Sequence, residues 1–266
     1  MPSRSEWDTG DMADDITSPT NDRIKRLVRL RDRRHRDDES VLLVEGRREL
    51  ERAINAGFSP TEVYLPDGDT LDSPGSRVFF CSAEAMAKAS YQTRPDTVIG
   101  IIEQFDISLD QIALGSHPMI LVAEGLEKPG NLGAILRTAE AAGADAVIAV
   151  DSRVDPFNPN VVRASTGAIF SVPFADAGLA ETLQWLRAAG VSMLAASPQA
   201  ETPHWGVDLT GRVALMVGSE DIGLSDAAEA AADRLIRIPM WGAGDSLNTS
   251  VSMAILAYET VRQRSG

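Results

Sequence analysis

The sequence predicts an α/β protein whose C-terminal part is built on a mainly parallel sheet with helices on both faces. From residue 119 onward, short apolar segments of strand length alternate with longer segments of helical spacing. The short segments are apolar at successive positions, which is typical of strands buried on both faces. A smaller α/β region precedes them. The segment over residues 105–118 separates the two regions, because it loses periodicity and ends in Gly and Pro.

These patterns divide the chain into four segments. Residues 1–15 are polar, acidic and aperiodic, which predicts a disordered tail. We then expect a small domain over residues 16–104, a linker over residues 105–118 and a larger domain over residues 119–266. With 266 residues, of which 44% are hydrophobic, the chain is long enough for two separate cores.

The composition favours the cytoplasm as the compartment. No apolar run approaches the roughly 20 residues that a membrane span needs, and the first 15 residues lack the pattern of a signal peptide. Cys81 is the only cysteine, so a disulfide framework and a cysteine-based zinc site are excluded within one chain. We expect its thiol to be buried and unreactive.

The first element of the small domain is a basic stretch over residues 23–36, which holds eight Lys or Arg against the single Asp32. We expect one amphipathic helix with an apolar stripe inside and a basic face outside. The net charge of −14 argues against general binding of nucleic acid, so a polyanion would bind locally. A solvated helix surface is the alternative, but the excess of cations favours RNA contact. The candidate RNA contacts are Arg23, Arg26, Arg29, Arg33 and Arg36.

The remaining elements of the small domain follow from apolar runs and helical spacing. Strands are predicted over residues 40–46, 61–66, 77–82 and 96–104, and helices over residues 47–57 and 83–89.

The larger domain shows the clearer alternation of strands and helices. Its strands are predicted over residues 119–126, 144–151, 171–176, 191–197, 212–220 and 235–240. Its helices are predicted over residues 131–143, within 155–168, over 178–190 and over 246–264.

Three polar, glycine-containing segments, residues 124–139, 218–225 and 239–250, follow predicted strands. Ligands of open parallel sheets bind at the carboxyl ends of the strands, so these segments predict one shared site. Hydrolytic and metal chemistry have little support, because the three histidines lack triad or metal-ligand spacing. The first segment also lacks the G-x-G-x-x-G spacing of a dinucleotide site, which leaves a nucleotide-dependent oxidoreductase as a weaker alternative.

Arg137 lies off the apolar stripe of the predicted helix from Asn131. Gly133, one turn earlier, would leave the guanidinium a clear path toward the helix N-terminus, because side chains lean that way. From this segment alone, an ordinary solvated arginine is an equal alternative.

The three segments, in this order, resemble the SpoU (TrmH-like) family of S-adenosylmethionine-dependent RNA ribose 2'-O-methyltransferases of the SPOUT superfamily. "KPGNLGAILRTAEAAGADAVI", "LMVGSEDIGLS" and "IPMWGAGDSLNTSVSMAILAYE" are similar to its three motifs. The first domain, with "VEG" at residues 44–46, is similar to the RNA substrate-binding domain of rRNA-modifying members. The resemblance implies a deep trefoil knot in the C-terminal domain and a pocket that holds bent S-adenosylmethionine.

The resemblance also assigns roles to residues. It implies cofactor contacts at Gly218, Ile238, Met240, Ser246 and Leu247. It implies a catalytic group of Arg137, Asn131, Glu220, Ser246 and Asn248, with Arg137 close to the target ribose and no metal required.

The family pattern further implies rRNA rather than tRNA as substrate, because of the extra domain, with a catalytically silent RNA-binding protein as an alternative. It implies a homodimer through the C-terminal domain, for which the last helix offers Val251, Ile255, Leu256 and Tyr258. Lys128 and Thr249 depart from the family pattern. We expect these departures to affect the choice of target more than the reaction.

Overall fold

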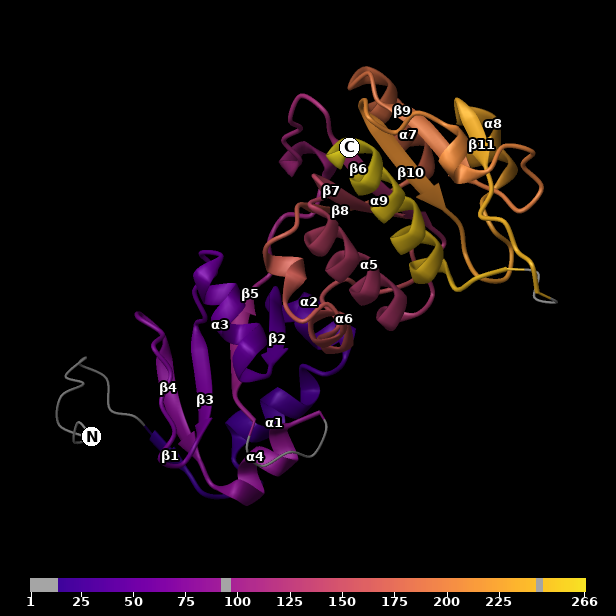
Figure 1. Cartoon of the computed structure of the whole chain (residues 1–266). Coiled ribbons are helices and arrows are strands. Elements are labelled where there is room, and N and C mark those ends of the chain that lie inside the picture. Colours follow the sequence, from indigo (N-terminus) through magenta and orange to yellow (C-terminus); the bar gives the residue numbers. More distant parts are fainter. Residues whose placement is uncertain (1–13, 92–96, 243–245) are drawn as a thin grey trace. The chain divides into compact units, whose positions relative to one another are not determined.

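The computed structural model describes residues 14–91, 97–242 and 246–266. The chain divides between Gln104 and Phe105 into two compact units, which are described separately here (Figure 1). Among the described residues, no helix has the length and apolar character needed to cross a membrane. The predicted disordered tail lies mostly outside the described residues.

The first unit alternates helices with short strands. Its elements are β1 (Asp14–Ile16), α1 (Asp22–Arg29), α2 (Arg33–Glu39), β2 (Val41–Glu45), α3 (Arg47–Asn55), β3 (Glu62–Pro66), β4 (Arg77–Cys81), α4 (Ala83–Ala89) and β5 (Ile99–Glu103).

A mixed sheet in the order β1-β4-β3-β5-β2 organises this unit. β1, β4 and β3 are parallel to one another, whereas β5 runs antiparallel to both β3 and β2. β1 corrects the prediction of a disordered tail up to residue 15, because its backbone pairs with β4. Cys81 lies in the core, where burial raises the pKa of its thiol to about 12.

The basic stretch forms two helices instead of the single helix that we predicted. α1 ends at Arg29, and Asp32 begins α2 by accepting a hydrogen bond of 2.9 Å from the backbone N–H of Arg34. The guanidinium of Arg36 donates to the carbonyl oxygens of Leu30 and Arg31, each at 2.8 Å. Arg36 therefore satisfies backbone groups at the break between the helices and is only 1% exposed.

The second unit contains the predicted regular alternation. Its elements are η1 (Leu109–Gln111), β6 (Met119–Glu124), α5 (Pro129–Ala142), β7 (Ala146–Val150), α6 (Pro159–Ala164), η2 (Ala168–Phe170), β8 (Phe174–Ala177), α7 (Leu179–Ala188), β9 (Ser192–Ala196), η3 (His204–Gly206), β10 (Val213–Val217), α8 (Asp226–Ala231), β11 (Arg234–Ile236) and α9 (Thr249–Ser265).

The mainly parallel sheet predicted for this unit is confirmed. The described strands pair in the order β11-β9-β10-β6-β7-β8, and every pairing is parallel. α5 and α9 cover one face of the sheet, and α7 and α8 cover the other (Figure 1). β6 and β10 are neighbours although about 90 residues separate them in the sequence, which brings the loops that follow them together.

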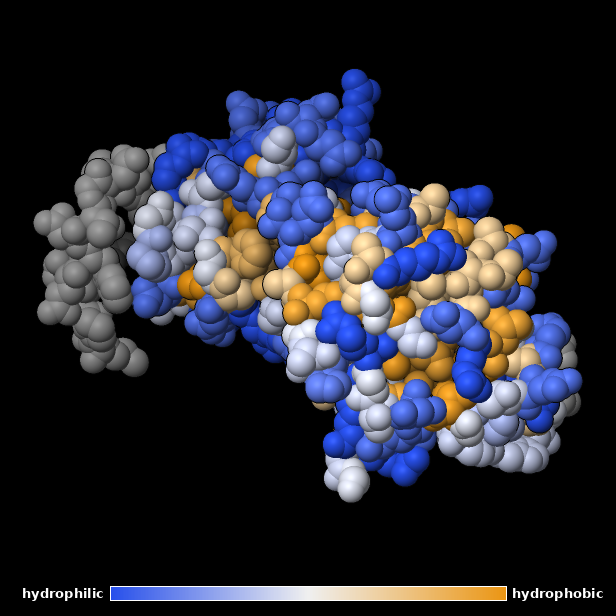
Figure 2. All heavy atoms as spheres, turned by 90° about the horizontal axis from the view of Figure 1, so that it is seen from above, coloured by the Kyte–Doolittle hydropathy of each residue, from blue (hydrophilic) through white to orange (hydrophobic). Residues whose placement is uncertain are grey.

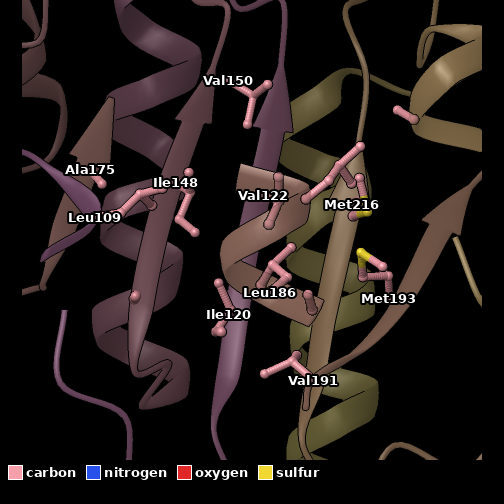
Figure 3. Close-up of a cluster of buried hydrophobic side chains, with 14 of the residues drawn as sticks. Leu109, Ile120, Val122, Ile148, Val150, Ala175, Leu186, Val191, Met193 and Met216 are labelled. Carbon is pink, nitrogen blue, oxygen red and sulfur yellow. The ribbon is translucent and has the colours of Figure 1, made fainter. Parts of the chain in front are cut away.

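The core under α7 explains why these strands are apolar at successive positions. Figure 3 shows Leu186 of α7 over Ile120 and Val122 of β6, with Met193 and Met216 from the two strands beyond. The opposite face of the same strands is buried under α5 and α9, so both faces need apolar side chains.

One prediction for this unit needs correction, and one helix was not predicted. Residues 105–118 are not a free linker, because Leu109 and Ile112 enter the core and the Phe105 ring packs against Phe157 at 5.1 Å. The six-residue helix α8 was not predicted, because its Ala-rich sequence is too short to show helical periodicity.

Candidate active site

Three loops of the second unit lie at the carboxyl end of its parallel sheet. They connect β6 to α5, β10 to α8 and β11 to α9, and they belong to the three glycine-containing segments predicted from the sequence. Because the paired strands are all parallel, their carboxyl ends share one edge, which is where open α/β sheets bind ligands.

The loop after β10 is tightened by contacts between its own ends. The backbones of Ser219 and Gly223 exchange two hydrogen bonds of 3.1 Å. A Cβ atom on Gly218 would overlap the backbone of Gly223, so this close approach requires glycine. The buried carboxylate of Glu124, at the end of β6, accepts a hydrogen bond of 2.9 Å from the backbone N–H of Ser225. These contacts fix the loop to the neighbouring strand.

A cluster of four polar side chains joins the three loops. The Oε1 atom of Glu220 accepts hydrogen bonds from the amides of Asn131, at 3.0 Å, and Asn248. Asn248 also donates to the Oδ1 atom of Asn131 at 3.1 Å. The Oε2 atom of Glu220 accepts a hydrogen bond from the ammonium group of Lys128. The Lys128 ammonium, followed by the Asn131 amide, holds the pKa of Glu220 below its ordinary value, so the carboxylate is ionised at neutral pH.

The start of α9 is part of the same arrangement. Asn248 caps this helix, because its Oδ1 atom accepts hydrogen bonds from the backbone N–H groups of Ser250, at 3.0 Å, and Val251, at 3.4 Å. The Ser250 hydroxyl donates to the same oxygen at 2.6 Å. Thr249 donates from its hydroxyl to the carbonyl of Gly218 at 3.0 Å. Asn248 therefore caps the helix with its Oδ1 atom and donates to Glu220 with its Nδ2 atom.

A cavity of about 330 Å³ opens beside this cluster, between the ends of β9, β10 and β11. Its volume lies in the range of about 300–1,000 Å³ that small-molecule sites have. All the positions that we predicted for the cofactor line it: Gly218, Ile238, Met240, Ser246 and Leu247. Their contact with a cofactor stays a prediction.

Glu220 borders two hollows. It lines the larger cavity and also a smaller one of about 60 Å³, whose lining includes Lys128 and Asn131. Residues 219–222 form a wall shared by both. Within the part of the chain that the structure describes, no group of three or more His, Cys, Asp or Glu side chains is placed to hold a metal ion.

Arg137 is not brought into the cluster within one chain. It is exposed on α5, six residues beyond Asn131, which corresponds to about 9 Å along the helix axis. It makes no hydrogen bond or ion pair with any described residue. Ser246 likewise lines the cavity without a hydrogen bond to the cluster. Of the predicted catalytic group, only Asn131, Glu220 and Asn248 are in mutual contact.

Gly133 lies at the contact between α5 and α6. A Cβ atom on Gly133 would overlap the Cβ of Ala164 and lie 2.8 Å from the backbone nitrogen of Ser165. Its missing side chain therefore allows α5 and α6 to pack closely, and the clear path for Arg137 stays a prediction.

The predicted RNA contacts in the first unit differ in their surroundings. Arg29 and Arg33 are exposed, and Arg33 pairs with Asp37 at 3.3 Å. Arg26 pairs with Glu39 and Glu62, at 2.7 Å and 2.9 Å. Arg23 is partly exposed and lies over the ring of Phe79. The prediction for Arg36 is corrected, because its guanidinium is buried and bonded to backbone carbonyls.

Sequence reasoning missed Lys128 as part of the cluster. We expected this departure from the family pattern to lie away from the chemistry, yet its ammonium contacts Glu220. Lys128 and Asn131 are three residues apart at the first turn of α5, and that spacing places two side chains on one face of a helix. The spacing was the available signal, but the partner on the β10 loop was not visible in the sequence.

Solved structures with this fold define the class of protein. An RNA 2'-O ribose methyltransferase aligns over 95% of this chain and all of its own, with 40% identity and a TM-score of 0.84. The S-adenosylmethionine-bound rRNA methyltransferase of Sinorhizobium meliloti aligns over 94% of this chain and 98% of its own, with 29% identity and a TM-score of 0.85. The fold is that of an RNA 2'-O-methyltransferase that uses S-adenosylmethionine.

The family follows from the sequence comparison. Residues 118–258 match the SpoU rRNA Methylase family, and residues 21–100 match the MRM3-like substrate binding domain. The 23S rRNA (guanosine-2'-O-)-methyltransferase RlmB of Bordetella pertussis is 35% identical over 74% of this chain and 83% of its own length. The chain belongs to the SpoU rRNA methylase family.

Proposed function

We propose that this protein transfers a methyl group from S-adenosylmethionine to a ribose 2'-hydroxyl of structured rRNA. The observation that carries this proposal is the cavity beside the Asn131–Glu220–Asn248 cluster, at the carboxyl edge of a parallel sheet. The name of the Bordetella relative supports 23S rRNA as the substrate. We also propose the cytoplasm as the protein's compartment.

The residues of this site fit the cofactor and the reaction. Gly218 and its loop line the cavity, and Ile238 and Leu247 add apolar surface to it. When bound, S-adenosylmethionine supplies an activated methyl group. Its transfer to the ribose 2'-oxygen would release S-adenosylhomocysteine and the hydroxyl proton. The protein must therefore align two substrates and assist that proton, which requires no nucleophile of its own.

We assign to Arg137 the contact with the target ribose during methyl transfer. Its guanidinium is exposed and has no partner among the described residues, so it is free to contact a ribose or phosphate oxygen. Asn131, Glu220 and Asn248 orient the loops around the site, and Ser246 lies at its edge.

We infer that two copies associate through α9 and that Arg137 acts at the resulting interface. Val251 and Tyr258 on α9 are 47% and 51% exposed, and Ile255 lies between them on the same face. Leu256, which we had counted as part of this surface, is fully buried in its own unit. Figure 2 shows hydrophobic surface on the second unit, toward the right of the view. A monomer in light scattering at micromolar concentration would contradict the dimer.

We also propose the trefoil knot implied by the family pattern. β11 is an edge strand, and α9, the next helix in the sequence, packs on α5, β6 and β10. An experimental chain trace in which the segment before α9 passes outside the loop after β10 would contradict this proposal.

RNA contact is proposed for the exposed Arg29 and Arg33 of the first unit and for the partly exposed Arg23 and Arg26. We expect Arg29→Ala with Arg33→Ala to weaken rRNA binding and to flatten its salt dependence by about 0.7–0.9 log-log units per lost phosphate contact. Arg36→Ala should instead lower the free energy of unfolding by about 1.5–3 kcal/mol, because two backbone carbonyls lose a charged donor. Filter binding and thermal melts measure the two effects. If Arg36→Ala weakened rRNA binding as much as the double variant and kept the wild-type stability, the separate roles of these arginines would be contradicted.

The function is tested with the purified chain, labelled S-adenosylmethionine, and rRNA or tRNA from cells that lack the gene. We expect label in a ribose 2'-oxygen of rRNA, and we expect S-adenosylhomocysteine binding that survives EDTA in calorimetry. Label in tRNA alone would favour a tRNA methyltransferase. RNA binding without any methyl transfer would favour a catalytically silent protein of the same fold.

A further inference from the structure

Lys128 occupies an unusual position among the charged residues of the site. It stands at the N-cap of α5 but makes no capping hydrogen bond with its side chain. The side chain instead crosses to the loop after β10, where its ammonium group meets the Oε2 atom of Glu220. The contact therefore joins two loops that are 92 residues apart in sequence.

Lys128 and the two asparagines use different oxygens of the Glu220 carboxylate. The Oε1 atom accepts from the amides of Asn131 and Asn248, and the Oε2 atom accepts from Lys128. With donors on both oxygens, the carboxylate cannot rotate without losing a hydrogen bond. Without Lys128 the carboxylate could rotate more easily, and the amides of Asn131 and Asn248 would lose their fixed orientation.

The charges around Lys128 support the same role. The carboxylates of Glu220, Asp221 and Glu127 all favour its protonated form, and Glu220 has the largest effect in raising the pKa of Lys128. Glu127 also pairs with Arg153 at 2.8 Å, so the direct partner of Lys128 is Glu220.

We propose that Lys128 is a positioning residue for methyl transfer, which holds the Glu220 carboxylate at the cofactor cavity in the orientation that fixes the amides of Asn131 and Asn248. This inference rests on the proposed function. It adds Lys128 to the reaction as a residue that acts through Glu220.

The role differs from that of an ordinary surface ion pair. The side chains of Lys128 and Glu220 are 66% and 26% exposed, so their pairing contributes little to stability. We therefore expect Lys128→Met to keep a melting temperature close to that of the wild type. Its kcat for rRNA methylation should fall by up to about 100-fold, as small misplacements in an active site do.

A double-mutant cycle tests whether Lys128 acts through Glu220. In a Glu220→Gln background, Lys128→Met should cause no further loss of kcat, whereas independent effects would multiply. Lys128→Arg should recover much of the activity, because a guanidinium can also donate to the Oε2 atom. Arg153→Met is the matched control, since it removes a neighbouring exposed ion pair with Glu127 at 2.8 Å, and it should leave kcat unchanged.

A titration of the Glu220 carboxyl carbon by NMR gives a readout that is independent of activity. The pKa of Glu220 should be higher in Lys128→Met than in the wild type, because the largest cause of its lowering is removed. The inference would be overturned if the kcat losses of Lys128→Met and Glu220→Gln multiplied in the double variant. It would also be overturned if Lys128→Met kept the kcat of the wild type. A wild-type protein that transfers no methyl group would instead overturn the proposed function, and the titration would still test the contact.

Discussion

Arg137→Ala should lower the turnover of rRNA methylation by roughly 10²- to 10⁴-fold, the range typical of a lost acid–base group. The cofactor affinity should stay within a few-fold, because Arg137 is not among the residues that line the cavity. The fold should be intact, since the side chain is exposed and bonded to no described residue. Single-turnover kinetics and calorimetry with S-adenosylhomocysteine measure the two quantities separately.

Two further variants sharpen this test. Arg137→Lys should fail nearly as badly, because an ammonium group cannot reproduce the planar pair of donors that guanidinium offers. Arg187→Ala is the control, since Arg187 is also an exposed arginine and lies on α7, on the opposite face of the sheet. Normal turnover in Arg137→Ala would remove this residue from the chemistry.

Gly218→Ala should abolish measurable S-adenosylhomocysteine binding. The added methyl group would overlap the backbone of Gly223, so the loop that walls the cavity must open. Forcing a group into such a packed position costs typically about 1–3 kcal/mol, so the melting temperature should also fall. Calorimetry and thermal melting measure these effects.

Gly211→Ala is the matched control for Gly218→Ala. A Cβ atom on Gly211 meets nothing within 4 Å, and its backbone needs no positive φ, so binding and stability should be unchanged. Wild-type cofactor binding by Gly218→Ala would show that the loop tolerates a side chain. The close approach would then not be needed for the cavity.

The success of the sequence predictions varied from element to element. α5 and α9 were predicted well because their apolar spacing is long and regular, although α5 begins at Pro129 and α9 at Thr249. The basic stretch over residues 23–36 was predicted as one helix, because the spacing of its residues does not reveal the break between α1 and α2. That break depends on Asp32 as a cap and on Arg36 folding back onto carbonyls, which are contacts that periodicity does not encode.

The site residues also differ in how well the sequence predicted them. Sequence motifs located the three loops, but the resemblance did not place Lys128 in the cluster, and the exposed Arg137 is not joined to it within one chain. The resemblance implied cofactor contact at Gly218, and the structure adds that a side chain there would collide with the backbone of Gly223.

The sequence by itself determined the α/β alternation, the doubly buried strands and the placement of glycine-rich loops after them, because these depend on the order of apolar and polar residues along a short segment. Only the tertiary structure decided which side chains meet. The Lys128–Glu220 contact exists because β6 pairs with β10, and strand order is set by the packing of the whole sheet. Contacts between residues about 90 positions apart therefore leave no local pattern in the sequence.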